Sequence, residues 1–160
     1  MWPWRRRVEV VLALIAGDDA TATLAMILRY HRRSVTLDEV RQAIHGDRTG
    51  ALNANHVVAA AEQFRLQARG LAADHPTQLG QIPTPSIAHM MQGPGPFPRR
   101  RDQDRDGYFA VVVSISPRRI RWIDPYSGQR DHEHAVFLEY ASGVFLVFDD
   151  AQALPRARLR

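Results

Sequence analysis

The apolar residues of this chain change their spacing between its two halves. In the first half they recur at helical spacing, and in the second half they form short runs rich in β-branched and aromatic residues. The first helical stretch is apolar on most faces, so it should be covered by protein on most sides. Helices are expected at residues 20–31, 37–45 and 54–64. Strands are expected at residues 66–71, 86–90, 108–115, 119–123 and 143–148, with a short amphipathic helix at 134–141.

Capping residues mark the starts of these helices. Asp18 or Asp19 can cap the first helix, because a short carboxylate accepts free backbone N–H groups and complements the positive helix end. Thr36 and the glutamate three residues later form a capping box for the second helix. Asn53 or Asn55 is expected to cap the third, and Asp74 a brief helix that ends near residue 82.

The order of elements, helices first and an antiparallel sheet afterwards, predicts an α+β fold in a single domain over residues 1–160. The core should run from about residue 8 to 149 and begin with an extended segment at 8–14. Residues 93–107 are rich in Pro, Arg, Asp and Gly, which predicts a mobile surface loop, and 151–160 should be a frayed tail.

Composition excludes several classes of site. The chain has no cysteine, so disulfides, thiolate metal sites and a cysteine nucleophile are excluded. All 21 basic residues are arginine, but their runs are scattered, which does not favour nucleic-acid binding. The basic N-terminus and the apolar run at 10–16 imitate a signal peptide. The apolar run has only a minimal length, and Glu9 interrupts the apolar stretch that begins at Val8. We expect no membrane span and a cytoplasmic location.

The sequences of six segments carry a family resemblance. They read TLAMILRYHRRSVTLDEVRQAI, ANHVVAAAEQFRLQARGL, IPTPSIAHM, YFAVVVSI, RIRWIDPYSGQR and FLEYASGVFLV. Together they resemble the peptidase C39 family, the papain-like cysteine protease domains that precede the membrane spans of bacteriocin-exporting ABC transporters. The resemblance runs from Val8 to Asp149 and implies a papain-like fold, with a helical half packed on an antiparallel sheet.

When the family's active-site motif is placed on this sequence residue by residue, the resemblance implies a degenerate active site. The nucleophile position holds Asp19, the oxyanion-glutamine position holds Ala13, and the catalytic-histidine position holds Tyr108. Asp124 keeps the third member of the triad, and Tyr108 should donate its hydroxyl to it. His89 lies on the preceding strand and does not replace the missing base. The resemblance therefore implies no cysteine-peptidase activity.

What remains of such a domain is a peptide-binding groove. Members of the family recognise the leader helix of a precursor peptide, so we expect a catalytically inactive, peptide-binding adaptor in bacteriocin or ribosomal-peptide maturation or export. Its partners would be a leader peptide or secretion substrate, with an ABC exporter or a peptide-modifying enzyme. Asp18, His89 and Tyr126 are candidate peptide-binding residues. No cofactor and no metal are expected.

Two other functions compete with this one. An enzyme could have rebuilt a non-cysteine chemistry at an Asp19/Asp124 pocket, with a carboxylate as acid or base or with a bound cation. The second competing function is that of a purely structural subunit of a larger complex. The cluster at 132–134, His-Glu-His, is expected in a turn before the last short helix, where a solvated polar run is its ordinary explanation.

Overall fold

In the described part of the chain, a six-stranded antiparallel sheet and five helices form the fold. The computed structural model describes residues 6–46, 52–92 and 107–150. The expected loop at 93–107, apart from its last residue, and the expected tail at 151–160 lie outside the described residues. The helices are α1 (Asp19–Tyr30), α2 (Leu37–His45), α3 (Ala54–Gln63), α4 (Pro76–Leu79) and α5 (His134–Tyr140). The strands are β1 (Leu66–Ala72), β2 (Ser86–Met90), β3 (Tyr108–Ile115), β4 (Arg119–Asp124), β5 (Gly128–Glu133) and β6 (Ala141–Asp150).

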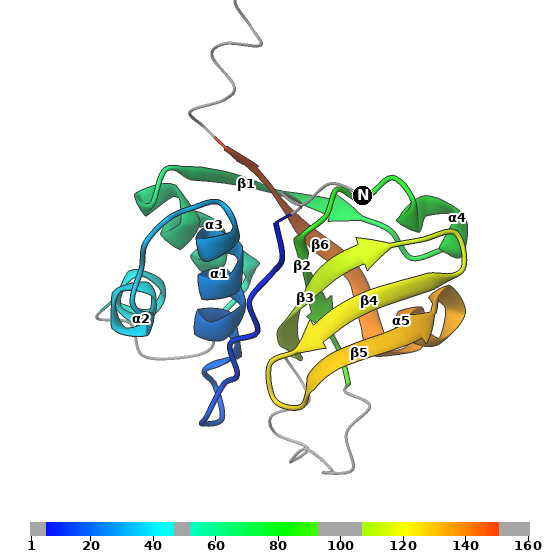
Figure 1. Cartoon of the computed structure of the whole chain (residues 1–160), viewed down its shortest axis with the longest axis horizontal. Coiled ribbons are helices and arrows are strands. Elements are labelled where there is room, and N and C mark those ends of the chain that lie inside the picture. Colours follow the sequence, from blue (N-terminus) through cyan, green and yellow to red (C-terminus); the bar gives the residue numbers. More distant parts are fainter. Residues whose placement is uncertain (1–5, 47–51, 93–106, 151–160) are drawn as a thin grey trace, which may run out of the picture.

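The sheet separates two layers of helices. Its strand order is β1-β6-β2-β3-β4-β5, so the last strand in sequence lies between the first two. In Figure 1, α1, α2 and α3 lie together on one side of the sheet, while α5 lies against the other face. Successive residues of β3 face opposite sides of the sheet. Phe109 and Val111 face the three-helix core, and Ala110 and Val112 face the core around Trp122. The predicted α+β class is confirmed.

The predicted helix signals are confirmed at three positions. In α1, nine consecutive residues from 20 to 28 are buried, as expected for a helix that is apolar on most faces. Thr36 and Glu39 form the expected capping box of α2. Of the two asparagines considered for α3, Asn53 is the cap, and the ring of His56 returns a hydrogen bond to its N–H.

One predicted turn was wrong, and one predicted helix is present with a different cap and end. Residues 128–133 form strand β5 instead of a turn, so His132 and Glu133 lie in a strand and His134 begins α5. This edge strand carries polar residues throughout, and its pairing with β4, not an apolar pattern, makes it extended. The brief helix α4 ends at Leu79, and His75, not Asp74, accepts the capping hydrogen bond from a backbone N–H.

The segment before α1 connects the two halves of the molecule. Residues 8–14 are extended, as predicted, and run between α1 and the sheet (Figure 1). Val8 and Val11 pack against the core on the helical side. Its backbone is tied to the sheet where Ala13 N–H donates to the Pro125 carbonyl at 2.7 Å. In the described part of the chain, no helix combines the length and apolar character required to cross a membrane.

Candidate functional site

The first residue of α1 meets the first strand of the second half of the chain. Asp19 is half-buried, and its Oδ2 accepts a hydrogen bond from Phe109 N–H at 2.9 Å. Its Oδ1 accepts one from the Tyr126 hydroxyl, also at 2.9 Å. Gly17, with φ of +87°, turns the extended segment into the helix, and its N–H donates to the same hydroxyl at 3.2 Å. Asp19 thus links α1 to β3 and to the turn after β4.

A second hydrogen bond, between Tyr108 and Asp124, lies beside the one between Asp19 and Tyr126. The Tyr108 hydroxyl donates to Asp124 Oδ2 at 2.8 Å, which confirms the bond expected from the sequence. Asp124 is the last residue of β4 and is buried, and its Oδ1 accepts from Tyr126 N–H at 2.8 Å. That second bond fixes the turn after β4, because a carboxylate that accepts from a backbone N–H two residues on closes an Asx-type turn. The rings of Tyr108 and Tyr126 lie 5.9 Å apart.

The structure therefore brings four of the predicted site residues together. Asp19, Tyr126, Asp124 and Tyr108 form one chain of hydrogen bonds, and Ala13 joins it through the carbonyl of Pro125. The side chain of Ala13 is a methyl group and can donate no hydrogen bond. The role of Tyr126 as a bridge was missed by sequence reasoning, because 107 residues separate it from its partner carboxylate.

Asp18 points away from this cluster. It occupies the N-cap position of α1, but its side chain makes no capping hydrogen bond, so the predicted capping role was wrong. Its carboxylate instead takes a two-pronged contact from Arg41 of α2, with Nε to Oδ1 at 3.1 Å and Nη2 to Oδ2 at 2.8 Å. This hydrogen bonding holds the pKa of Asp18 below its usual value, against the opposing effect of burial. Asp18 thus joins α1 to α2.

His89 also lies outside the cluster. Its Nδ1 is within hydrogen-bond distance of Ser142 Oγ, at 2.9 Å, and its ring packs 5.6 Å from the ring of Phe109. A side chain at Gly107 would meet both the Met90 carbonyl and the His89 ring, so this position requires glycine. The half-buried imidazole is therefore held between β6 and the start of β3.

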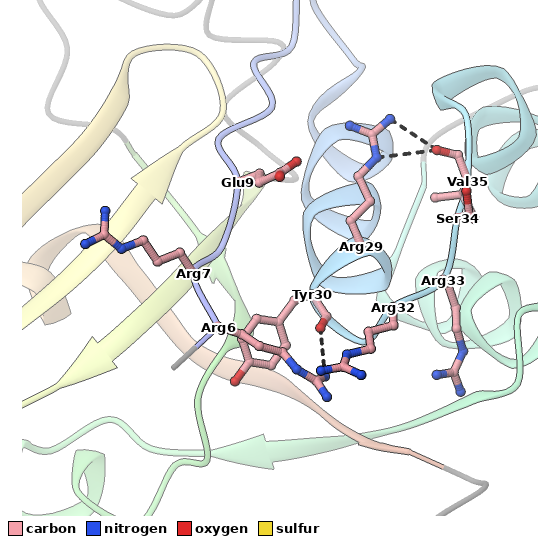
Figure 2. Close-up of a pocket in the computed structure, with 9 residues that line it drawn as sticks. All are labelled: Arg6, Arg7, Glu9, Arg29, Tyr30, Arg32, Arg33, Ser34 and Val35. Atoms are coloured by element: carbon pink, nitrogen blue, oxygen red, sulfur yellow. Dashed lines mark hydrogen bonds between the residues drawn. The ribbon is translucent and has the colours of Figure 1, made fainter. Parts of the chain in front are cut away.

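A cavity of about 500 Å³ lies at the opposite end of α1 (Figure 2). Five arginines dominate its lining, against a single carboxylate, that of Glu9. No local pattern in the sequence predicts this cavity, because its arginines come from two separate stretches that the fold brings together. The lining residues are Arg6, Arg7, Glu9, Arg29, Tyr30, Arg32, Arg33, Ser34 and Val35.

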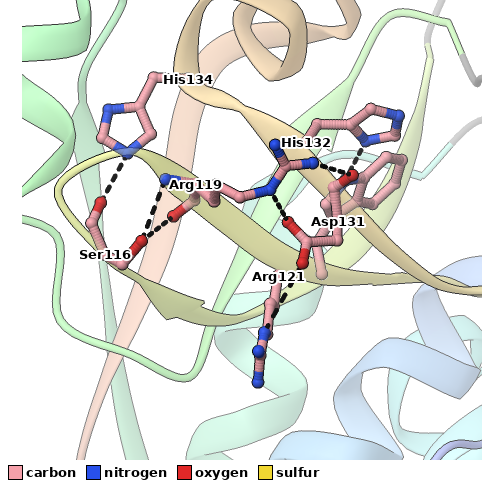
Figure 3. A network of polar contacts seen from close by, with 7 residues as sticks. Ser116, Arg119, Arg121, Asp131, His132 and His134 are labelled. Carbon is pink, nitrogen blue, oxygen red and sulfur yellow. Dashed lines mark hydrogen bonds and ion pairs between the residues drawn. The ribbon is translucent and has the colours of Figure 1, made fainter.

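The polar residues of β4 and β5 form a third group (Figure 3). Asp131 pairs with Arg119 at 2.6 Å and with Arg121 at 3.8 Å, across the β4–β5 ladder. His132 Nδ1 accepts a hydrogen bond from Trp122 Nε1 at 3.0 Å. Burial, and then the charges of two nearby arginines, lower the pKa of His132. These contacts hold the hairpin and the Trp122 ring in place, which is a structural role.

The chemistry available at the Asp19–Asp124 cluster is limited. Both oxygens of each carboxylate already accept a hydrogen bond, so a substrate or cation at this position would have to compete with these contacts. Within the part of the chain that the structure describes, no three His, Cys, Asp or Glu residues are grouped so that they could hold a metal ion. The cluster is a set of polar contacts between four segments.

Comparison with known proteins identifies related chains. A model described as the peptidase C39 family matches residues 8–153. No curated protein matches the chain. Among solved structures, a double glycine motif protease from an AMS/PCAT transporter in complex with the leader peptide is 25% identical and has a TM-score of 0.71. The match covers 91% of this chain and 94% of that one.

Two further structures share the fold at lower identity. The peptidase domain of Streptococcus ComA, a bi-functional ABC transporter involved in a quorum sensing pathway, is 18% identical, with a TM-score of 0.71, over 89% of this chain and 98% of that one. The N-terminal peptidase C39 like domain of the toxin secretion ATP-binding protein from Vibrio parahaemolyticus is 16% identical, with a TM-score of 0.60, over 85% and 99%.

Proposed function

Since the chain belongs to the peptidase C39 family, we propose that it binds a leader peptide or secretion substrate without cutting it. It would act as an adaptor in the maturation or export of that peptide. An ABC exporter or a peptide-modifying enzyme would be its further partner, and the cytoplasm its location.

The bonding of Asp19 is the observation that carries this proposal. Where the family resemblance places the nucleophile, this chain has a carboxylate that accepts two hydrogen bonds, from Phe109 N–H and the Tyr126 hydroxyl. Amide hydrolysis by the family's mechanism requires a thiolate, a base and oxyanion donors. Tyr108, in the histidine position, donates to Asp124, and a phenol with an ordinary pKa near 10 is a poor base at neutral pH. The same hydrogen bonds argue against a rebuilt carboxylate chemistry.

Peptide binding is supported by the surface beside the cluster. Leu12 is 45% exposed, Leu14 is 89% exposed, and Tyr126 presents its ring beside the Asp19 carboxylate. Apolar side chains with this exposure, grouped on one segment, are typical of an interaction surface. The related structure with a bound leader peptide shows that a chain of this fold can hold such a ligand.

Fluorescence anisotropy with labelled double-glycine leader peptides tests the proposal. Leu12→Asp should weaken binding, because it places a charge in the apolar surface. Val144→Asp is a matched control, since Val144 is 43% exposed but lies on β6. Binding that is no stronger than to scrambled peptides, or that both variants weaken equally, would contradict the proposal.

A further inference from the structure

The arginine pocket at the C-terminal end of α1 has an unusual charge. Five arginines and one glutamate line it, a net charge of +4 that equals the formal charge of the whole chain. In Figure 2 the side chains of Arg6 and Arg32 reach from opposite sides toward the last turn of α1. Like charges gathered around one cavity repel each other, and an anion placed among them removes that repulsion.

The helix end explains only part of this cluster. Basic side chains are favourable at a helix C-terminus, where they complement the negative end of the dipole. Arg6 donates to the Tyr30 carbonyl at 3.1 Å, and Arg29 donates to the Val35 carbonyl. Arg7 and Arg32 make no such contact, and within residues 6–46, 52–92 and 107–150 neither forms an ion pair with a carboxylate.

Arg33 already donates through Nε, Nη1 and Nη2 to the carbonyls of Phe64, His31 and Arg65. Arg6, in contrast, still has donors to offer. Arg6 uses only Nη1 on the Tyr30 carbonyl, so Nε and Nη2 remain for a second acceptor. These two atoms form the edge of the guanidinium that pairs with a carboxylate or phosphate through two parallel bonds. Its carbonyl contact and its position 5.9 Å from the Tyr30 ring hold the group in place before a ligand arrives.

The extended segment that leads from this pocket adds a second, independent feature. Val10, Leu12 and Leu14 alternate along it and are 41%, 45% and 89% exposed. Among the described residues, its backbone makes one hydrogen bond to another segment, at Ala13. An extended chain with exposed apolar residues and free backbone groups can accept another strand. From Arg7 to Ala13 it spans about 20 Å at ~3.3 Å per residue.

We propose that an acidic peptide segment docks here, with its carboxylates in the arginine pocket and its apolar residues along residues 10–15. A peptide fits both features, since one linear chain of about eight residues can supply the charges and the alternating side chains. A small phosphorylated ligand would fill the pocket alone and leave the apolar row uncovered. This inference rests on the proposed peptide binding and specifies the chemistry of the peptide.

Anisotropy with two labelled ten-residue probes tests the inference. One probe has three glutamates at its N-terminal end, and the other has them at its C-terminal end. Both have alternating leucines in the remaining residues. One probe or both should bind, with an affinity that falls as salt is added. Replacing the glutamates with lysine should abolish binding. Arg32→Glu should weaken binding about tenfold, since reversal of an exposed charge removes an attraction and adds a repulsion.

The control is Arg118→Glu, which changes the net charge by the same amount at an exposed residue outside the pocket. Equal losses in both variants, or no loss in Arg32→Glu, would overturn the pocket assignment. Binding of pyrophosphate without binding of either acidic probe would overturn it in favour of a phosphorylated ligand. In each of these cases the double-glycine leader peptides could still bind, so failure of this inference is distinguishable from failure of the proposed function.

Discussion

The carboxylate of Asp19 accepts a hydrogen bond from the backbone N–H of Phe109, 90 residues further along the chain, at 2.9 Å. This contact fastens the start of the buried helix α1 to the start of strand β3. The second oxygen of the same carboxylate receives the Tyr126 hydroxyl. The side chain that the family resemblance places at the nucleophile position therefore joins α1 to β3 and to the turn after β4.

Asp19→Ala should destabilise the protein by about 1–3 kcal/mol, because it leaves the N–H of the buried Phe109 without an acceptor. Asp19→Asn should cost less, since its amide oxygen can still accept that bond. Urea unfolding of both variants measures the difference. Glu139→Ala, at an exposed position of α5, is the control and should stay within about 0.5 kcal/mol of the parent protein. If Asp19→Ala has the same free energy of unfolding as the control, the hydrogen bond between Asp19 and Phe109 does not contribute to stability.

Restoring the family's residues should restore a trace of activity. Asp124 already accepts a hydrogen bond from the side chain at position 108, so a histidine there would be oriented by the same carboxylate. We expect the triple variant Ala13→Gln, Asp19→Cys, Tyr108→His to cut a double-glycine leader peptide slowly. The matched control places the cysteine at position 18, where the native side chain faces Arg41. Cleavage by the control, or none by the triple variant, would contradict the assigned positions.

The Asp18–Arg41 pair should stabilise the protein at neutral pH and lose this effect in acid. The folded pKa of Asp18 lies below the ordinary value of 3.8, chiefly through its hydrogen bond with Arg41. The stabilisation is therefore complete above pH 3.8 and is lost as the pH falls from there through the folded pKa. Thermal melts should show this loss in the parent protein but not in Asp18→Asn. At neutral pH, Arg41→Met should lower the melting temperature more than Asp38→Asn, because Asp38 is 93% exposed.

His132 should make the protein less stable in mild acid. Its pKa is lowered first by burial, and its Nδ1 must be unprotonated to accept from Trp122. The unfolded chain therefore binds the proton more readily, and stability falls as the pH drops below about 6.5. His132→Asn keeps an acceptor for the indole and should flatten this dependence between pH 7 and 5 in thermal melts. An unchanged slope would show that another group is responsible.

Local signals in the sequence predicted much of the fold. The apolar faces of α1, the capping box at Thr36 and the β-branched run of β3 each depend on residues that are neighbours in the chain. Strand β5 was missed because its residues, from Gln129 to Glu133, are polar on both faces. What makes it a strand is pairing with β4, which no local pattern records.

The site was only partly predictable for the same reason. The family resemblance placed Asp19, Tyr108 and Asp124 in one cluster, and the structure shows them there. The partner of Asp18 was not predictable, because Arg41 lies 23 residues away on another helix. The arginine pocket was not predictable either, because only the fold brings residues 6 and 7 to the end of α1.

Binding of a leader peptide without cleavage is the function proposed for this chain. Native mass spectrometry of the protein, incubated with double-glycine leader peptides, reads binding and cleavage in one sample. We predict a one-to-one complex with the intact peptide and no shortened product after prolonged incubation. A product cut after the double glycine, absent when Asp19→Ala replaces the parent protein, would contradict the claim.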